Sequence, residues 1–468
     1  MESQRSSSRA ERPVLRHSSL TGGSFIKDHQ QYKPAVSTPP VTQNISDVLQ
    51  TVKEDGSPLP LRTNPISPDP EKVTDSGIVH SIYPVSPNPL PAGTPKLVAT
   101  IFYNPSRPVQ PNGSSNGSSS TGNSQSQSVP AGSAPSADVE KLPREPLEPD
   151  PEPLDHLYGQ FVSQLCVASF LQMLEGLQTP FQRMNTSHRC LDQEEQPRVV
   201  EVTALPLPNP EYLSFADLRK HESVWRFERE WNVEVVLQKE SVFRRHKRLA
   251  VFDMDSTLIQ NEVIDEIAKF VGVEKEVSQI TARAMNGELD FSASLKARVS
   301  LLKGVPADVF DKLKSVITIS PGARELCRAL KALGYKLAVL SGGFQPLAEW
   351  LADQLGIDFA HANHLEIDES TQTLTGNLVP TYPIIDAARK RDLLRSIAAD
   401  HDIPLNQTLA VGDGANDLLM LHEAGLGVAW RAKSKVQLEA PTRLNGESLT
   451  DVLYLLGLSD EEIKELLA

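Results

Sequence analysis

Cysteine is scarce in this sequence of 468 residues, which contains only Cys166, Cys190 and Cys327. Their odd number and the lack of paired metal-ligand spacing argue against a disulfide scaffold, and favour reduced thiols in an intracellular protein. None of the three lies in a recognisable nucleophile context, which argues against cysteine catalysis.

Long apolar runs are also missing. The polar N-terminus has no hydrophobic signal-peptide core, and no uninterrupted apolar stretch is long enough to span a bilayer. We therefore expect a soluble, cytoplasmic protein that does not bind membranes. The Ser- and Arg-rich start keeps a mitochondrial presequence open, although Glu2 and Glu11 are atypical of one.

Positive charge is in deficit, because the formal net charge is −14. Broad attraction to nucleic acid needs a cationic surface, so we expect no nucleic-acid partner and favour a small-molecule ligand. One basic run remains at residues 244–248 (RRHKR). We interpret it as a solvated segment before a buried strand rather than as a binding patch.

The first third of the chain holds most of the 36 prolines. Residues 1–95 are dominated by Ser, Pro, Thr and charged residues without sustained periodicity. Such a composition cannot build a packed core, so it predicts a disordered low-complexity region.

A small α+β accessory domain is predicted over residues 96–240. It begins with a β-branched, aromatic-rich strand, KLVATIFY, which cannot be stable alone. A low-complexity tract over about 104–153 follows, and we interpret it as a surface-loop insertion. The other expected elements are helices near 154–177 and 214–231 and strands near 198–205 and 232–240.

From residue 248 to 468, short apolar strands that end in polar clusters alternate with helices. The expected strands are Leu249–Phe252, Lys336–Leu340, Leu409–Val411 and Gly427–Ala429. This pattern predicts an α/β catalytic domain with a doubly wound parallel sheet, whose ligands gather at the carboxyl ends of the strands. Helical periodicity over about 262–320 predicts a helical cap inserted after the first strand.

Two carboxylates, Asp253 and Asp255, stand one residue apart where the first of these strands ends. In an extended strand they would point to opposite faces, so the chain must bend there for both to serve one site. One carboxylate can then attack phosphorus while the other protonates the leaving oxygen, as covalent phosphoryl transfer requires.

Three further elements are expected at the same edge of the sheet. Ser341–Gly343 offers a hydroxyl and unobstructed backbone N–H groups to a phosphate. Gly412–Asp417 (GDGAND) offers oxygen ligands that suit Mg²⁺. Lys390 is a candidate cation between the nucleophile and the phosphoryl group. Each signal is weak alone, and their convergence predicts a magnesium-dependent phosphoryl-transfer site.

DMDST, SGG, the later lysine and GDGAND, in this order, resemble the four motifs of the haloacid dehalogenase (HAD) superfamily of phosphatases. Longer stretches resemble phosphoserine phosphatases specifically, at residues 253–268, 280–304, 338–344, 362–368 and 411–429. The resemblance covers the chain from about residue 248 and implies a HAD-like Rossmannoid sheet with a cap. It also implies hydrolysis of O-phospho-L-serine, the final step of L-serine biosynthesis, through an aspartyl-phosphate intermediate.

The resemblance also assigns roles to individual residues. Asp253 is implied as the nucleophile and Asp255 as the general acid and base, with Thr257 orienting their loop. The implied phosphate contacts are Ser341, Gly342, Gly343, Lys390 and Asn416. The implied Mg²⁺ ligands are Asp253, the backbone carbonyl of Asp255, and Asp413, with Asp417 in support.

Substrate selection is assigned to the cap by the same resemblance. Glu262 and Arg298 match positions that face the ammonium and the carboxylate of a bound amino acid. The pairing is physically apt, because a zwitterion needs one anion and one bidentate cation. Met285 and Phe291 match residues that close over the ligand and exclude water, with ordinary packing inside the cap as the alternative.

By element order alone, the accessory domain resembles the small ACT-like regulatory domains that precede the catalytic domain in some phosphoserine phosphatases. This leaves regulatory serine binding and a homodimer open. Two other functions also stay open at this point. One is a phosphatase of the same superfamily that acts on another phosphomonoester or on phosphoprotein, and the other is a non-catalytic serine-sensing or scaffold protein.

Overall fold

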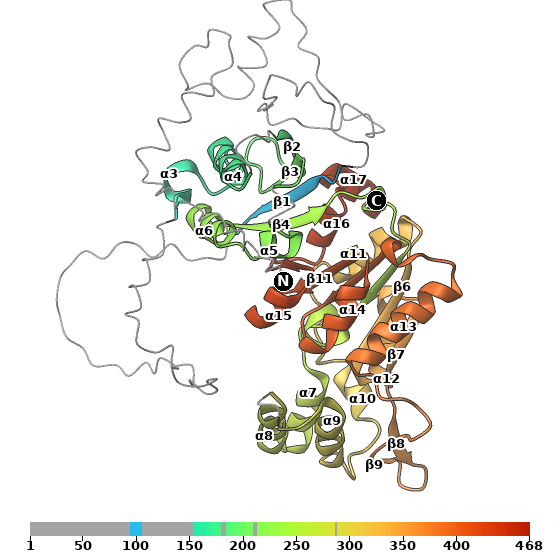
Figure 1. Cartoon of the computed structure of the whole chain (residues 1–468). Coiled ribbons are helices and arrows are strands. Elements are labelled where there is room, and N and C mark those ends of the chain that lie inside the picture. The colour runs from blue at the N-terminus through green and yellow to red at the C-terminus, as the bar shows by residue number, and fades with distance from the viewer. Residues whose placement is uncertain (1–93, 105–152, 179–183, 209–212, 286–287) are drawn as a thin grey trace, which may run out of the picture. The chain divides into compact units, whose positions relative to one another are not determined.

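The computed structural model describes residues 94–104, 153–178, 184–208, 213–285 and 288–468 (Figure 1). The predicted disordered region up to residue 93 and the low-complexity tract from 105 to 152 lie outside the described residues. None of the described helices has the length and apolar composition that a bilayer crossing requires.

The first sheet has four antiparallel strands in the order β2-β3-β1-β4. β1 (Leu97–Tyr103) lies between β3 (Val199–Leu205) and β4 (Val233–Lys239), while β2 (Asn185–Cys190) forms an edge. Every residue of β1 is buried, because the strand has a neighbour on each side, as its apolar sequence requires. The sequence does not predict β2, since NTSHRC is too polar for the usual strand pattern.

Four helices accompany this sheet: α3 (Asp155–Tyr158), α4 (Gln164–Gly176), α5 (Phe215–Arg219) and α6 (Glu222–Trp231). Each of the two long helices expected from the sequence is therefore divided into two. Capping side chains inside the expected spans explain the division. The Ser163 side chain accepts a hydrogen bond from the backbone N–H of Cys166 at the start of α4, and the His221 ring accepts one from Ser223 at the start of α6.

The second sheet has six parallel strands in the order β12-β11-β10-β5-β6-β7 (Figure 1). The strands are β5 (Leu249–Phe252), β6 (Lys336–Phe344), β7 (Phe359–Asn363), β10 (Thr408–Gly412), β11 (Leu426–Trp430) and β12 (Thr442–Leu444). The predicted parallel α/β sheet is confirmed, and its four expected strands form its centre. The two edge strands, β7 and β12, are additional to the prediction.

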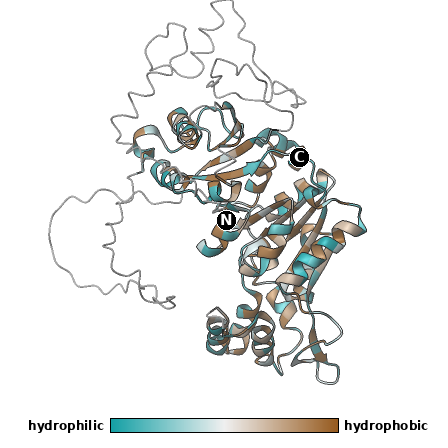
Figure 2. Cartoon of the chain, viewed as in Figure 1, coloured by the Kyte–Doolittle hydropathy of each residue, from teal (hydrophilic) through white to brown (hydrophobic). Residues whose placement is uncertain are grey.

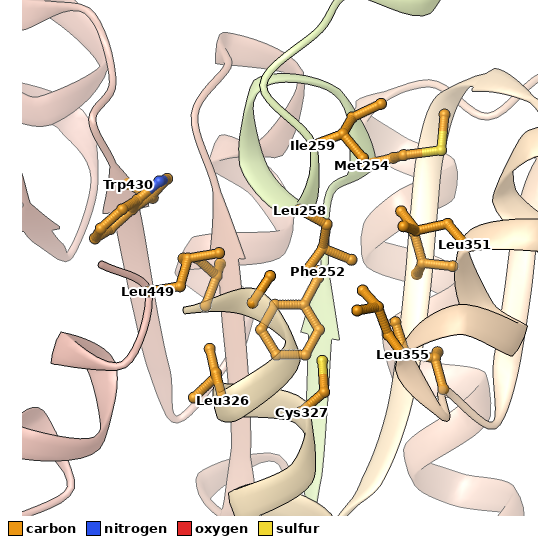
Figure 3. Close-up of a cluster of buried hydrophobic side chains, with 14 of the residues drawn as sticks. Phe252, Met254, Leu258, Ile259, Leu326, Cys327, Leu351, Leu355, Trp430 and Leu449 are labelled. Atoms are coloured by element: carbon orange, nitrogen blue, oxygen red, sulfur yellow. The ribbon is translucent and has the colours of Figure 1, made fainter. Parts of the chain in front are cut away.

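Helices cover both faces of the six-stranded sheet, as the alternation of side chains along a strand requires. On one face, Phe252 packs in a core with Leu326 and Cys327 of α11 and Leu351 of α12 (Figure 3). On the other face, Val251 belongs to a separate core beneath α13 and α14. Figure 2 accordingly shows apolar strands between helices that carry polar residues on their outer sides. The helices after the cap are α11 (Ala323–Ala332), α12 (Gln345–Leu355), α13 (Ala387–Asp400), α14 (Leu418–Glu423), α15 (Ser434–Glu439), α16 (Asp451–Leu455) and α17 (Asp460–Leu467).

A helical segment follows β5, and Figure 1 shows its first three helices grouped away from the sheet. It contains α7 (Val263–Val271), α8 (Glu274–Met285), α9 (Phe291–Ser300) and α10 (Val309–Leu313). The antiparallel hairpin of β8 (Leu365–Asp368) and β9 (Thr373–Leu378) is bonded to this segment. The Gly304 N–H donates to the Leu374 carbonyl, and the Leu374 N–H donates to the Val305 carbonyl, both at 2.8 Å.

The interpretation of residues 244–248 as a solvated segment is only partly right. Arg244 is 6% exposed and forms an ion pair with Glu201 of β3 at 2.6 Å, while its Nε donates to the Leu455 carbonyl at 2.9 Å. Lys247 is also buried and donates to the Asn406 carbonyl at 3.1 Å. Arg244 and Lys247 are therefore internal, because a carboxylate and backbone carbonyls satisfy their charges, whereas His246 and Arg248 are exposed.

The three cysteines all lie in the described part of the chain, are buried and form no disulfide there.

Candidate active site

The central position of β5 brings the sequence motifs together. β5 has β10 on one side and β6 on the other, and all three strands run parallel. The residues that follow their carboxyl ends therefore share one edge of the sheet. These are the loop that begins at Asp253, the Ser341–Gly343 turn and the Gly412–Asp417 turn.

A buried lysine joins two of these loops. Nζ of Lys390, in the first turn of α13, lies 2.8 Å from Oδ1 of Asp253 and 2.7 Å from Oδ1 of Asp417. The Lys390 side chain is fully enclosed. Burial alone would lower its pKa, but the two carboxylates outweigh burial and hold the pKa of Lys390 above its usual range. The lysine therefore keeps its charge at the centre of the site.

The oxygens of Asp253 have different surroundings. Oδ1 accepts the backbone N–H of Met254 at 2.7 Å as well as the Lys390 ammonium. Oδ2 receives no hydrogen bond from the described residues. Burial, and then the neighbouring Asp417, raise the pKa of Asp253, while Lys390 opposes both. The Lys390 ammonium therefore favours the charged form of this carboxyl against the effect of burial.

Three carboxylates converge on one point. One oxygen from each of Asp253, Asp413 and Asp417 lies within 4.8 Å of the other two. Thr257 donates to Oδ1 of Asp413 at 3.2 Å, and the Gly414 N–H donates to Oδ2 of Asp417 at 3.0 Å. Burial and the charges of Asp417 and Glu262 raise the pKa of Asp413 to about 7. The single charge of Lys390 does not balance three carboxylates, so the donor set fits a divalent cation with oxygen ligands.

Asp255 lies in the bend that leads away from β5. Its Oδ1 is buried and accepts no hydrogen bond from the described residues. Burial, followed by the charge of Glu262, raises the pKa of Asp255 well above its usual range. A carboxyl that keeps its proton near neutral pH is suited to donate it to a leaving oxygen. The bend predicted between Asp253 and Asp255 is present, because Met254 between them leaves the extended conformation that the two aspartates keep.

The Ser341–Gly343 turn is a bulge at the end of β6. Leu340 pairs with His361 and Phe344 with Asn363, so the three residues of the turn lie opposite Ala362 alone. The Gly343 N–H donates to Oγ of Ser341 at 2.8 Å. A Cβ on Gly343 would lie 2.9 Å from the Met254 side chain, so only glycine fits there without displacement.

Asn363 holds this turn in place, and its role is not predicted from the sequence. The side chain is 2% exposed. Its Nδ2 donates to the Gly342 carbonyl at 2.9 Å, and its Oδ1 accepts the Ile385 N–H at 2.9 Å. Asn363 thereby joins the turn to the segment that leads into α13 and Lys390. An amide at the end of the strand sequence FAHAN was the available signal, within the stretch ANHLEID.

The cap contributes residues above this edge. A Cβ on Gly342 would lie 3.1 Å from the Phe291 ring, so this ring lies against the Ser341–Gly343 turn. Arg298 is half-buried with Nε lacking a partner, and burial lowers its pKa despite the nearby charges of Asp265, Glu262 and Asp255. Glu262 accepts a hydrogen bond from Ser256 at 2.7 Å. Asn416 is half-buried beside Gly414, whereas Met285 ends α8 and its side chain lies outside the described part of the structure.

A parallel α/β sheet with a helical cap, and a lysine enclosed by aspartates at its carboxyl edge, is the architecture of a phosphoryl-transfer hydrolase. The family described as haloacid dehalogenase-like hydrolase matches residues 247–425. This range contains all of the sequence motifs noted above.

Individual relatives define the family more narrowly. A probable phosphoserine phosphatase of Schizosaccharomyces pombe is 49% identical over 236 residues, which are 50% of this chain and 78% of that protein. The phosphoserine phosphatase of Saccharomyces cerevisiae is 47% identical over 233 residues, 50% of this chain and 74% of that protein. This chain belongs to the phosphoserine phosphatase family of haloacid dehalogenase-like hydrolases.

One solved structure extends the similarity. A HAD-family hydrolase from Salmonella enterica serovar Typhi is similar with a TM-score of 0.51 and 31% sequence identity, covering 62% of this chain and 95% of that one. The share of this chain that it covers is larger than the half matched by the two yeast proteins.

Proposed function

We propose that this protein hydrolyses O-phospho-L-serine to L-serine and phosphate through an aspartyl-phosphate intermediate. The observation that carries the proposal is the buried Lys390 between Asp253 and Asp417, 2.8 and 2.7 Å away, beside the Ser341–Gly343 turn. A cation enclosed in this way neutralises an incoming phosphoryl group without solvent reorganisation. The two yeast relatives, both called phosphoserine phosphatases, support the choice of substrate.

In the first step, Oδ2 of Asp253 attacks phosphorus in line with the serine oxygen. The bond from phosphorus to that oxygen breaks, and the Asp255 carboxyl donates its proton to the departing serine. In the second step, the Asp255 carboxylate takes a proton from water, which attacks the same phosphorus. The bond to Asp253 breaks, phosphate leaves and both carboxyl groups return to their starting states.

Lys390 and the Ser341–Gly343 turn contribute to both steps by their position and charge. The ammonium holds Oδ1 of Asp253 at 2.8 Å, which leaves Oδ2 as the attacking oxygen. The backbone N–H groups and the hydroxyl of Ser341–Gly343 receive the phosphoryl oxygens, and Asn416 approaches from the other loop. Because the lysine is buried and charged, it attracts the phosphoryl group in the ground state and in the transition state alike.

Magnesium suits the acidic cluster. Asp253, Asp413 and the backbone carbonyl of Asp255 would hold the ion, and Asp417 would support them through its bonds to Lys390 and the Gly414 N–H. When bound, Mg²⁺ neutralises the attacking carboxylate and the phosphate oxygens. The raised pKa of Asp413, about 7, shows how unfavourable the cluster is without such a charge.

Recognition of the amino acid is assigned to Glu262 and Arg298. Arg298 makes no ion pair with the described carboxylates, so its guanidinium is available to a substrate carboxylate. Glu262 would receive the ammonium group. Phe291, together with Met285, would close the site against water.

The first sheet with its four helices, over 96–240, is proposed to be an ACT-like domain that binds L-serine as a regulator. Its element order supports this. Calorimetry of the full chain with L-serine tests it. Heat that persists when Arg298→Ala has weakened the active site supports a second site, and its complete loss in that variant contradicts one.

Phosphate release from a panel of phosphomonoesters, with and without Mg²⁺, tests the catalytic proposal. We expect a preference for O-phospho-L-serine over phosphothreonine and aryl phosphates, and no turnover after EDTA treatment. Asp253→Asn should reduce turnover by at least about 10⁴-fold, because an amide cannot form the covalent intermediate. Asp400→Asn, at the exposed end of α13, is the matched control. Wild-type turnover in Asp253→Asn would refute the mechanism.

A further inference from the structure

Ser256 has an unusual backbone conformation in the loop between the nucleophile and the cap. Its φ of 54° and ψ of 5° lie in the left-handed region. An L-residue other than glycine is disfavoured there by about 1 kcal/mol, because Cβ approaches the following carbonyl oxygen. Glycine would adopt this turn freely, so the loop's shape alone does not require a serine.

The loop is closed by backbone hydrogen bonds on both sides of Ser256. The Ser256 N–H donates to the Asn261 carbonyl at 3.3 Å, and the Ile259 N–H donates to the Met254 carbonyl at 3.0 Å. Asn261 in turn accepts the Thr318 N–H at 2.8 Å through its side chain. The backbone of the turn is therefore fixed without the Ser256 hydroxyl.

Among the described residues, the Ser256 hydroxyl has one hydrogen-bond partner, and it is a cap residue. Oγ of Ser256 donates to Oε1 of Glu262 at 2.7 Å. Glu262 is the residue before α7, yet its side chain caps no N–H of that helix. Within the described part of the chain, Ser256 is the hydrogen-bond donor that fixes the direction of this carboxylate.

Glu262 lies among charges of both signs. Its negative charge is close enough to raise the pKa of both Asp255 and Asp413, and Arg298 also lies near it. Left to rotate, an exposed carboxylate would be free to turn toward water. A charge-assisted hydrogen bond of 2.7 Å opposes that rotation.

We infer that Ser256 is a positioning residue for substrate specificity: its hydroxyl holds Glu262 where the ammonium of an amino-acid phosphate binds. The inference rests on the proposed function, which gives Glu262 that ligand. Ser256 touches no reacting atom. It selects substrates that carry an ammonium group over phosphomonoesters that lack one.

Two substrates distinguish a role of Ser256 in ammonium recognition from a general role in catalysis. O-phospho-L-serine carries the ammonium group, and 3-phosphooxypropanoate is the same molecule with hydrogen in its place. The measured quantity is the ratio of kcat/KM for the two substrates. In Ser256→Gly this ratio should fall by about tenfold, the typical effect of losing one hydrogen bond to a charged group. The loss should be mainly in KM for O-phospho-L-serine, because ammonium binding changes little between ground and transition states.

Ser256→Gly is the appropriate variant because glycine accepts the left-handed backbone. Its urea unfolding midpoint should equal or exceed that of the wild-type protein, which removes misfolding as an explanation. A double-mutant cycle with Glu262→Gln adds a second readout. The ratio should fall in Glu262→Gln, and adding Ser256→Gly should lower it no further.

Three results would overturn the inference. An unchanged ratio in Ser256→Gly, whether both substrates keep their kcat/KM or lose it equally, would show that Ser256 does not select for the ammonium group. Additive losses in the double variant would show that Ser256 does not act through Glu262. A wild-type protein with no preference for O-phospho-L-serine would instead refute the proposed substrate, and the inference with it.

Discussion

The buried ion pair at the junction of the two sheets makes a quantitative stability prediction. Glu201 of β3 accepts from Arg244 at 2.6 Å and from Arg189 at 2.8 Å, and all of these partners are largely buried. Burial alone would raise the pKa of Glu201, but Arg244 and Arg189 lower it from 4.5 to about 2. A shift of this size corresponds to about 3 kcal/mol of stability.

We expect Glu201→Gln to lower the free energy of unfolding at pH 7 by about 3 kcal/mol, since the variant leaves Arg244 buried without its counter-charge. Urea unfolding followed by tryptophan fluorescence measures this. Glu369→Gln, in the exposed β8–β9 turn, is the matched control and should differ from wild type by less than about 0.5 kcal/mol.

The pH dependence gives a second check of the same reasoning. Because the folded-state pKa is depressed, the stabilisation is present above the unfolded value of 4.5 and is lost as the pH falls toward 2. The difference between wild type and Glu201→Gln should therefore shrink over that interval. A difference near zero at pH 7, or one that stays constant down to pH 2, would refute the reasoning.

Three predictions concern catalysis. Asp413→Asn should raise the Mg²⁺ concentration for half-maximal phosphate release by at least about tenfold, and an unchanged Mg²⁺ titration would contradict its placement among the ligands. Asn363→Ala should lower kcat/KM for O-phospho-L-serine by about tenfold or more, because the Ser341–Gly343 turn loses its link to the segment before α13; normal kinetics would remove Asn363 from the site's support. Arg298→Lys should raise KM by about tenfold with little change in kcat, since an ammonium cannot bind a carboxylate bidentately; an effect confined to kcat would argue against a substrate contact.

Much of the catalytic fold is visible in the sequence because its signals are local. The four central strands are short apolar runs bounded by polar clusters, and parallel pairing follows from the helices between them. The edge strand β12, with the sequence TRL, is too short and too polar to give such a signal. The bulge at Ser341–Gly343 depends on pairing between β6 and β7, which no local pattern reports.

The candidate site likewise contains residues that local sequence motifs mark and residues that only the three-dimensional structure reveals. Clustered motifs mark Asp253, Asp255 and Asp413 directly, whereas Asn363 and Ser256 are linked to the site by side-chain hydrogen bonds to distant or neighbouring groups. Such bonds depend on three-dimensional placement. The basic run at 244–248 was partly misinterpreted for a related reason, because a dense charge cluster is usually solvated, and here Glu201 and backbone carbonyls lie within reach of it.

The enclosure of Lys390 has a consequence for chemical labelling. An amine must lose its proton and meet an electrophile before it can be acylated, and this one is both fully enclosed and held charged by two carboxylates. Amine-directed reagents applied to the folded protein should therefore modify exposed lysines such as Lys464 and spare Lys390. Labelling of Lys390 would therefore indicate that the carboxyl edge of the sheet has opened.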